Sequence, residues 1–346
     1  GWWLLLSLLA FYPSQELRAQ GKITETSTHR FTEVGKGIYL AQTTARLFNS
    51  NALVVVNRND VLVVDSHITP TKGRELIQSI GVLTDNPITT LVNSHFHYDH
   101  SHGNQAFTDG TFPFEAAVEI IGHEFTRKKM MGKPLSESTF QRGLAGNEAY
   151  VKRLKRQIGE SQNELEREEL QNQLRLISSH LAEWSEIQPV APTTAFNDRL
   201  VLFRGQREIQ LHFFGRAHTG GDIVIYFPGE KLAFTGDMML AGPSWLGDGY
   251  VDEWVETLEN LKTLDIRKIV PGHGVPFSEI GRIDTVQSFY RDLWKKTKSL
   301  YEQGVSAEDA ASSIDMTNHE KSLGISRPGY DLFAIERMYR RMRNGD

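Results

Sequence analysis

The sequence predicts an α/β fold in which helices cover mixed sheets. The first indication is a strand–helix–strand order between residues 53 and 92, the unit from which such folds are built. A second group of short apolar runs, separated by turn residues, occupies residues 199–235. Between the two groups, residues 144–184 are rich in charge and leucine and have no glycine or proline after Gly159, which predicts long helices.

The first group of elements begins with residues 31–42, which alternate as one or two strands with a turn at Gly35 and Gly37. The β-branched runs 53–56 and 61–64 predict a hairpin across four polar residues. Residues 71–80 have helical apolar spacing, and residues 88–92 form a short buried strand. We therefore expect a sheet with at least one helix on it.

The second group continues with strands at 199–203 and 209–214 and a hairpin of residues 223–227 with 232–235. An amphipathic helix over 254–264 and a strand over 268–270 follow, and the chain from residue 284 is helical. Ser306 and Asp309 have the spacing of a capping pair. We interpret the last helix's arginines as a solvated face, with a partner-docking surface as the alternative; they are Arg337, Arg340, Arg341 and Arg343.

Residues 122–190 predict a helical hairpin inserted between the two groups of strands. Leucines and isoleucine recur at helical spacing amid charge from residue 165 to residue 181. One interpretation is a solvated scaffold, and another is a cover over the active site that selects substrates. A coiled-coil dimer arm is a third possibility.

Composition narrows the class of protein. The chain has 346 residues, 39% hydrophobic and 23% charged, as in ordinary globular proteins. A net charge of -5 gives no nucleic-acid footprint, and the absence of cysteine excludes disulfides and thiolate ligands. The apolar run at residues 2–11 is too short to span a bilayer. We interpret residues 1–19 as the remnant of a secretory signal cleaved after Ala19, with a buried N-terminal helix as the alternative.

A cluster of metal-binding side chains directly follows the strand at residues 88–92. Three imidazoles and a carboxylate fall within six residues: His95, His97, Asp99 and His100. In extended backbone, residues two apart point to the same side, so we expect His95, His97 and Asp99 to leave one side and His100 the other. Such a fork suits two adjacent metal ions.

This cluster and four other motifs resemble, in order, the metal-binding signature of the metallo-β-lactamase superfamily. The motifs are residues 63–65, 95–100, 215–222, 234–237 and 270–274. The likeness spans roughly residues 30–283. It implies a four-layer αββα metallo-β-lactamase sandwich over residues 28–283, carrying the 122–190 insert and followed by a C-terminal helical extension over 284–346.

The resemblance also implies a dinuclear site. His95, His97 and His218 match ligands of a first metal, Asp99, His100 and His273 match those of a second, and Asp237 matches a bridging carboxylate. Imidazole and carboxylate ligands suit two Zn²⁺, with Fe and Mn left open. In such enzymes a metal-bridging hydroxide attacks the substrate, and Asp99 is placed to accept or relay the proton.

Five further residues are considered for a supporting or substrate role. For Asp65 we expect hydrogen bonds to a ligand or its loop, with a turn or helix cap as the alternative. His67 and His102 are either close to the site or on the surface, and we favour the surface for His67. Trp245 and Tyr250 lie in a glycine-rich loop that is a candidate substrate wall.

The expected function is a dinuclear hydrolase of a small ester, lactone, amide (β-lactam-like) or thioester. An Asp at the bridging position without cysteine departs from cysteine-containing β-lactamases and resembles glyoxalase-II-like hydrolases and lactonases. The alternatives are a mononuclear iron oxygenase of the persulfide dioxygenase type and a phosphodiesterase or nuclease of the same fold. We expect a periplasmic or secreted protein with a small-molecule substrate, no nucleic-acid partner and no stable membrane span in the mature chain. The oligomeric state is left open.

Overall fold

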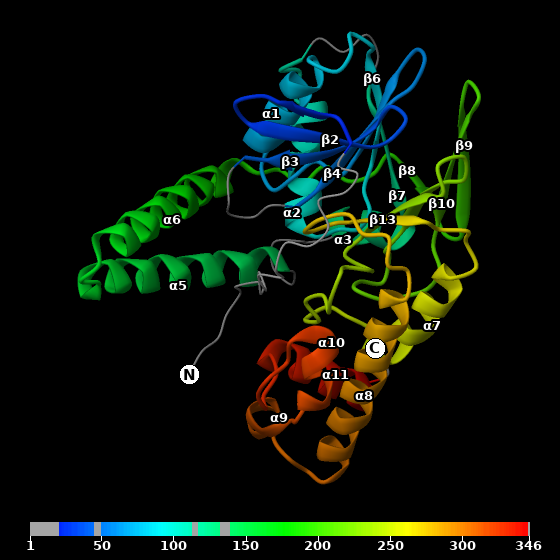
Figure 1. Cartoon of the computed structure of the whole chain (residues 1–346). Helices are drawn as coiled ribbons and strands as arrows, with labels where there is room; N and C mark the ends of the chain where they lie inside the picture. The colour runs from blue at the N-terminus through cyan, green and yellow to red at the C-terminus, as the bar shows by residue number, and fades with distance from the viewer. Residues whose placement is uncertain (1–20, 45–49, 113–116, 132–138, 345–346) are drawn as a thin grey trace. The chain divides into compact units, whose positions relative to one another are not determined.

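The computed structural model describes residues 21–44, 50–112, 117–131 and 139–344 (Figure 1). The predicted signal remnant at residues 1–19 lies outside these ranges. The chain divides into two compact units, residues 21–195 and the residues from 196 onward. Each unit contains one mixed sheet and its own helices. These two mixed sheets with helices confirm the predicted α/β class.

The first unit is built on an eight-stranded sheet whose strands follow chain order, with β8 at the boundary between the units. Neighbours from β1 to β5 are antiparallel, and β5, β6 and β7 are parallel. The strands are β1 (Ile23–Glu25), β2 (His29–Gly35), β3 (Ile38–Thr43), β4 (Ala52–Val56), β5 (Val61–Val64), β6 (Ile88–Val92), β7 (Glu119–His123) and β8 (Thr194–Phe196).

Helix α1 (Pro70–Ile80) packs its apolar side into the core of this unit. It begins where predicted because Thr69 Oγ1 accepts a hydrogen bond from the Lys72 N–H and proline occupies the first helical position. Leu76 is fully buried against the strand residues of the core, such as Val63 and Leu91. Burial of an aliphatic side chain of this kind stabilises the fold by about 1.5–3 kcal/mol.

Several short elements of the first unit were not predicted. Strand β7 pairs in parallel with β6 and lies between β6 and β8 in the sheet, so residues 119–123 belong to the sheet and the insert leaves the fold only after them. The short helix α2 (Tyr98–Ser101) interrupts the histidine cluster, and the 3₁₀ turn η1 (His102–Phe107) follows it. Helix α3 (Glu124–Met131) then leads toward the insert.

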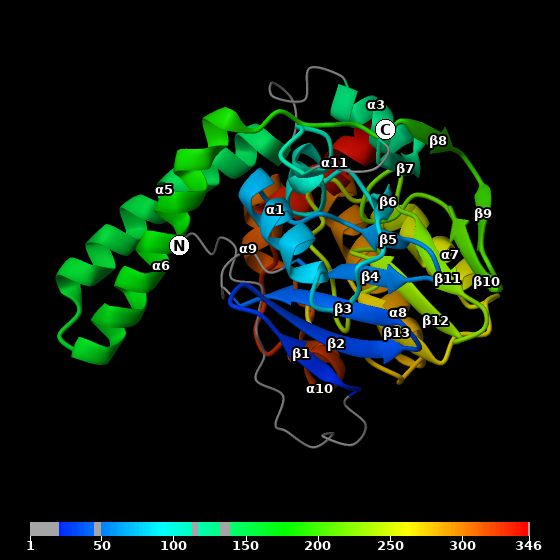
Figure 2. The ribbon, with the colours of Figure 1, turned by 90° about the horizontal axis from the view of Figure 1, so that it is seen from above.

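The insert is the predicted helical hairpin, formed by α5 (Thr139–Glu160) and α6 (Glu164–Glu183) and ended by the turn η2 (Trp184–Glu186). Asn163 caps α6, and the Tyr150 hydroxyl donates to Gln173 Oε1 across the pair at 2.7 Å. Figures 1 and 2 show the hairpin extending away from the sheet of the first unit. The predicted leucine stripe is only partly buried: Leu165 is 78% exposed, whereas Ile177 is fully buried.

The second unit holds a five-stranded sheet in the order β13-β12-β11-β10-β9. Its strands are β9 (Arg199–Arg204), β10 (Arg207–His212), β11 (Val224–Phe227), β12 (Leu232–Gly236) and β13 (Lys268–Pro271). All of them were predicted to within a few residues. Only the β12–β13 pair is parallel, so this sheet is also mixed.

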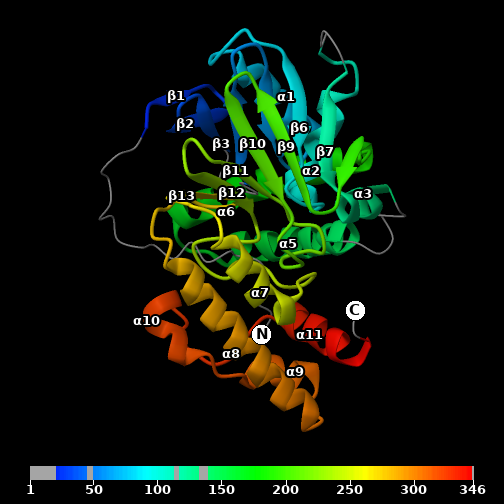
Figure 3. The same ribbon diagram turned by 90° about the vertical axis from the view of Figure 1, so that its right-hand side faces the viewer.

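Helices cover the second unit and continue to the end of the described chain (Figure 3). They are α7 (Val251–Leu261), α8 (Arg282–Glu302), α9 (Ala307–Ser313), the turn η3 (Thr317–His319), α10 (Glu320–Leu323) and α11 (Leu332–Asn344). They share one core with the sheet, in which Trp254 and Tyr290 are buried and their ring centroids lie 4.5 Å apart. The predicted cap is present, since Ser306 Oγ accepts from the Asp309 N–H.

The prediction that the arginine-rich face of α11 is solvated does not hold for Arg341. The Arg341 side chain is only 5% exposed and pairs with Asp252 and Glu253 of α7. In the described ranges, no helix combines the length and the apolar character needed to cross a bilayer.

Candidate metal site

The histidine cluster lies just beyond β6, at an edge where rigid strands position the loop. The prediction of a continuous extended fork was wrong, because α2 begins at Tyr98 with His97 as its N-cap residue. The Ser101 hydroxyl donates to the carbonyl of His97 at 3.0 Å, which stabilises this helical turn. Asp99 and His100 therefore leave a helical turn, whereas His95 and His97 precede it.

The structure nevertheless brings these four side chains together. The ring centroid of His95 lies 4.8 Å from that of His97 and 4.4 Å from that of His100. His100 Nε2 lies 3.3 Å from Asp99 Oδ2. The nitrogen and oxygen donors of these side chains thus face one another. Because the three imidazoles are almost fully buried, they are largely shielded from bulk water.

Asp65 supports this cluster from the end of β5. It is fully buried with a positive φ of 59°, a backbone conformation rare for a residue with a side chain. Its carboxylate accepts hydrogen bonds from the Ser94 N–H at 2.7 Å, the Ser94 hydroxyl at 2.7 Å and His100 Nδ1 at 2.8 Å. Burial raises the pKa of Asp65, and the hydrogen bonds from His100 and Ser94 act in the lowering direction.

The contact with Asp65 fixes the tautomer of His100. A carboxylate can only accept, so His100 carries its proton on Nδ1 and keeps a lone pair on Nε2. That nitrogen is the one on the Asp99 side of the ring. A carboxylate behind a metal-binding histidine orients the ring and raises its basicity.

His67 is buried rather than on the surface, contrary to expectation. It has a positive φ of 66° and is 1% exposed, and its Nε2 lies 3.2 Å from His29 Nε2. The Ser50 hydroxyl donates to the Asp99 carbonyl at 2.5 Å and lies 3.4 Å from His67 Nδ1. Burial and, to a lesser extent, Lys72 lower the pKa of His29 to about 4, so both imidazoles are neutral.

His102 is buried in an aromatic group beside the cluster. Its ring lies 5.9 Å from Tyr98 and 6.4 Å from Trp184, and Trp184 lies 4.9 Å from His180. Burial lowers the pKa of His102 to about 3. Since His180 and Trp184 end the hairpin, the base of the insert lies beside Tyr98 and His102, which flank Asp99, although the tip of the insert extends away.

The second unit brings together the other three predicted ligands. Asp237 follows β12, His273 follows β13, and His218 lies in the loop between β10 and β11. Asp237 Oδ2 lies 3.6 Å from His218 Nε2 and 3.3 Å from His273 Nε2. One carboxylate oxygen thus faces two imidazole nitrogens. This is the local arrangement expected if Asp237 bridges two metal sites, with His218 at one and His273 at the other.

The loop before α7 places its two aromatic candidates differently. The ring of Trp245 is half-buried and lies 6.4 Å from that of His218. Tyr250 is 8% exposed, and three guanidinium groups lie over its ring. Trp245 therefore adjoins a predicted ligand through its ring, whereas the ring of Tyr250 packs among arginines.

The donor set fits a metal centre. Every predicted ligand offers an imidazole nitrogen or a carboxylate oxygen, the donors that suit Zn²⁺, Fe or Mn in sites without thiolate. Within each unit these atoms face one another at 3.3–3.6 Å between carboxylate oxygen and imidazole nitrogen. The identity of the metal does not follow from this geometry.

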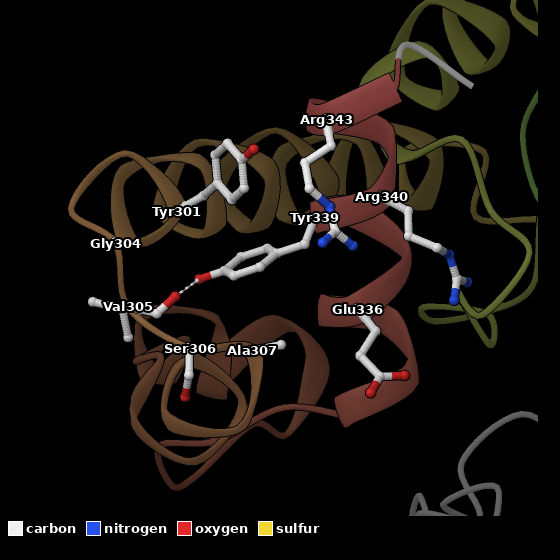
Figure 4. Close-up of a pocket in the computed structure, with 9 residues that line it drawn as sticks. All are labelled: Tyr301, Gly304, Val305, Ser306, Ala307, Glu336, Tyr339, Arg340 and Arg343. Carbon is white, nitrogen blue, oxygen red and sulfur yellow. Dashed lines mark hydrogen bonds between the residues drawn. The ribbon is translucent and has the colours of Figure 1, made fainter.

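A separate cavity of about 490 Å³ lies among the C-terminal helices (Figure 4). Its lining comes from the end of α8, the α8–α9 connection and α11, including Tyr301 and Tyr339. The Tyr339 hydroxyl donates to the Val305 carbonyl at 3.0 Å. None of the predicted metal ligands lines this cavity.

Comparison with known proteins agrees with the motifs. The family model described as the metallo-beta-lactamase superfamily matches residues 45–273. The linear primary-alkylsulfatase of a Pseudomonas strain is 22% identical over 279 residues, 75% of this chain and 48% of its own length. Metallo-beta-lactamase type 2 of Elizabethkingia meningoseptica is 31% identical over 75 residues, 20% of this chain and 30% of its own length. The chain thus spans half or less of the length of these curated relatives.

Solved structures show the same fold. A metallo-beta-lactamase from Pontibacter korlensis aligns with a TM-score of 0.53 and 14% identity, over 76% of this chain and 99% of that one. An Erythrobacter litoralis metallo-beta-lactamase aligns with a TM-score of 0.53 and 17% identity, over 78% of this chain and 100% of that one. At such low identity the likeness concerns the fold, since one fold hosts many reactions.

Proposed function

Because the chain belongs to the metallo-beta-lactamase superfamily, we propose that it is a hydrolase that cleaves a small ester, lactone, amide or thioester with a dinuclear metal centre. The observation that carries the proposal is the group of His95, His97, Asp99 and His100, with Asp65 orienting His100. An ordinary polar loop needs neither four clustered metal-binding side chains nor a buried carboxylate that orients one of them.

The ligand roles follow from the motifs. We propose His95, His97 and His218 for one metal, Asp99, His100 and His273 for the other, and Asp237 between them. The metals, when bound, supply Lewis acidity and an activated water. The proposed ligands come from both units of the chain. A measurement of metal binding therefore tests whether the ligands of the first unit and those of the second unit bind the same metals.

The chain's own residues have distinct tasks in this scheme. Asp65 holds His100 in the tautomer that leaves Nε2 able to bind a metal. The Asp99 side chain is 19% exposed, so it is the proposed group that accepts or relays the proton. The Ser50 hydroxyl, by donating to the Asp99 carbonyl, fixes the backbone at that residue.

The substrate class rests on finer features. An aspartate at position 237 and the absence of cysteine favour lactones and thioesters over the substrates of cysteine-containing β-lactamases. The alkylsulfatase relative acts, by its name, on linear primary alkyl sulfates, and its match covers 75% of this chain. We therefore add sulfate esters to the substrates that must be compared. Trp245, beside His218, is the proposed substrate contact.

We further propose that the protein is exported to the periplasm or secreted. The support is the apolar run of residues 2–11 followed by a small-residue cleavage site ending at Ala19. Expression of the chain in a bacterial host, followed by N-terminal sequencing of the periplasmic fraction, tests this. A mature protein beginning at Gln20 is the expected product, and an unprocessed cytoplasmic chain contradicts the proposal.

The test of the function is metal analysis of the purified protein together with a hydrolysis panel. The panel contains a lactone, a thioester, a β-lactam, an alkyl sulfate and a phosphodiester. Two zinc ions per chain and turnover of at least one of the first four substrates are expected. His95→Ala should lose metal and turnover, whereas His212→Ala, outside the predicted set, should keep both.

Other results identify the alternatives. One iron per chain with oxidation of a persulfide indicates the oxygenase, and turnover of the phosphodiester alone indicates the phosphodiesterase or nuclease. Metal-free protein that hydrolyses any of the substrates at full rate contradicts the proposed function.

A further inference from the structure

Tyr250, at the start of α7, lies within a cluster of charged side chains from three parts of the second unit. The guanidinium carbon of Arg216 lies 4.4 Å from the centre of its ring, and those of Arg337 and Arg341 lie 4.7 Å from it. Arg216 belongs to the loop that carries His218, whereas the other two belong to α11. The ring thus joins the end of the chain to that loop.

Two carboxylates at the start of α7 complete the cluster. Arg341 donates from Nε to Asp252 Oδ1 at 2.8 Å, and from Nη2 to Asp252 Oδ2 at 2.5 Å and to Glu253 Oε1 at 2.9 Å. Arg216 donates from Nε to Glu253 Oε2 at 2.8 Å and also pairs through Nη2. Glu253 is therefore shared between Arg341 on α11 and Arg216, two residues before His218.

The same elements hold the backbone of the loop that carries His218. The Tyr250 N–H donates to the Ala217 carbonyl at 2.7 Å, and the Thr257 hydroxyl donates to the Arg216 carbonyl at 2.8 Å. Gly215 has a φ of 133°, and a Cβ at that position would come within 2.5 Å of Thr257 Oγ1. The loop therefore packs against α7 so closely that a movement of α7 moves the residues before His218.

The His218 ring itself packs against α7. Its centroid lies 5.8 Å from that of Trp254, which is fully buried and donates from Nε1 to the Met238 carbonyl at 2.8 Å. The start of α7 thus contacts the residue before His218 through its backbone and the His218 ring through Trp254. Arg337 adds a hydrogen bond from Nε to the Gly249 carbonyl at 3.1 Å, so α11 holds this start at two adjacent points.

We propose that Arg341 is a positioning residue for His218. Its nearly buried guanidinium holds Asp252 and Glu253, and these fix the start of α7 and Arg216, which belongs to the loop that carries His218. The inference rests on the proposed function, because His218 is a ligand only if that function holds. It extends the site beyond the family model, which ends at residue 273, to a helix that begins at Leu332.

The geometry distinguishes this role from that of an ordinary surface ion pair. Exposed pairs contribute little because water and side-chain entropy offset their attraction. Arg341 makes a two-pronged contact with Asp252 while its side chain is 5% exposed, and such contacts fix direction as well as distance. A lysine at this position would keep the charge but would lack the planar fork.

The test compares Arg341→Gln and Arg341→Lys with Arg343→Gln, a matched change at an exposed arginine of the same helix. The measurement is Zn²⁺ affinity of the full chain by chelator competition, alongside the thermal unfolding temperature. Arg341→Gln should weaken the site by about 10-fold, the lower end of the range for groups that support metal ligands. Arg341→Lys should fall between that variant and the wild type, and Arg343→Gln should bind as the wild type does.

A double-mutant cycle with His218→Ala isolates the route of the effect. If Arg341 acts through His218, Arg341→Gln should change zinc affinity no further once His218 is absent. Should Arg341→Gln fail to fold, Asp252→Asn removes the same contact from the opposite side and takes its place. Lowered unfolding temperature with unchanged zinc affinity would overturn the inference and leave the proposed function standing. Wild-type protein that binds no zinc would overturn both.

Discussion

The buried carboxylate of Asp65 permits a sharp prediction, because an amide in its place conserves shape but not hydrogen bonding. Asp65 receives donors on both oxygens, two from Ser94 and one from His100 Nδ1. In Asp65→Asn, an NH₂ group facing His100 would donate to Nδ1 and force the ring proton onto Nε2. The opposite orientation would place the NH₂ group against the Ser94 N–H. The first orientation removes the lone pair with which Nε2 would bind a metal. The second places two hydrogen-bond donors against each other in a buried site.

The magnitude follows from the number of groups left without an acceptor. A buried donor without an acceptor costs about 1–3 kcal/mol. Asp65→Ala leaves the Ser94 N–H and His100 Nδ1–H in that state, so its loss of stability should be about 2–6 kcal/mol. Asp65→Asn should lose less stability, yet zinc affinity should fall by about 10–100-fold, as for other groups that orient metal-bound histidines.

The assay is zinc affinity by chelator competition, together with denaturant unfolding of the metal-free protein. Asp85→Asn, the same substitution at an exposed aspartate, serves as the control and should leave both quantities unchanged. Asp65→Asn with wild-type zinc affinity would refute the reasoning. It would show that Asp65 supports the fold of the loop without setting the tautomer of His100.

Three further predictions concern other parts of the chain. Asp237→Ala should lose both metals and activity together, and retention of two metals with full turnover would show that Asp237 is not the bridge. Replacing the hairpin helices, residues 139–183, by a short linker should leave zinc binding nearly intact and change KM and the relative rates across substrates. A change in the mass measured by light scattering with unchanged relative rates would instead identify a dimer arm. The free energy of unfolding should fall as the pH is lowered from about 6.5 toward 4. In this range His29 binds a proton in the unfolded chain, whereas in the folded chain buried His29, with a pKa of about 4, stays neutral. The loss from His29 is about 3 kcal/mol, and His29→Gln should remove that part of the pH dependence of the unfolding free energy.

The parts of the fold that the sequence predicts are those whose evidence is local. The β5 and β6 strands are short β-branched or apolar runs, and their period and flanking polar residues lie within the runs themselves. The histidine cluster was found for the same reason, since its ligands are neighbours in the chain. The order of the motifs then indicated which distant residues, such as Asp237 and His273, complete the set.

The features that were missed depend on partners far away in the chain. Strand β7 is recognisable only through its pairing with β6, because its two isoleucines are flanked by Glu119 and Gly122, which do not favour a strand. Helix α2 was missed because four residues carry little helical periodicity. Arg341 sits in a run of arginines that resembles a solvated face, and its burial depends on Asp252, 89 positions earlier.

The hairpin shows why a local pattern gives the element but not its role. The charged, leucine-containing pattern predicted two helices, and the structure contains them. A cover would have its leucines packed, yet Leu165 near the tip is 78% exposed, whereas Ile177 and Trp184 nearer the base are buried. Trp184 and His180 lie in the same aromatic group as Tyr98 and His102, which flank Asp99 and His100. Any influence of the insert on the proposed reaction therefore comes through its base, where the helix meets the ligand-bearing loop. The tip, which extends away, is the part that a dimer arm would use.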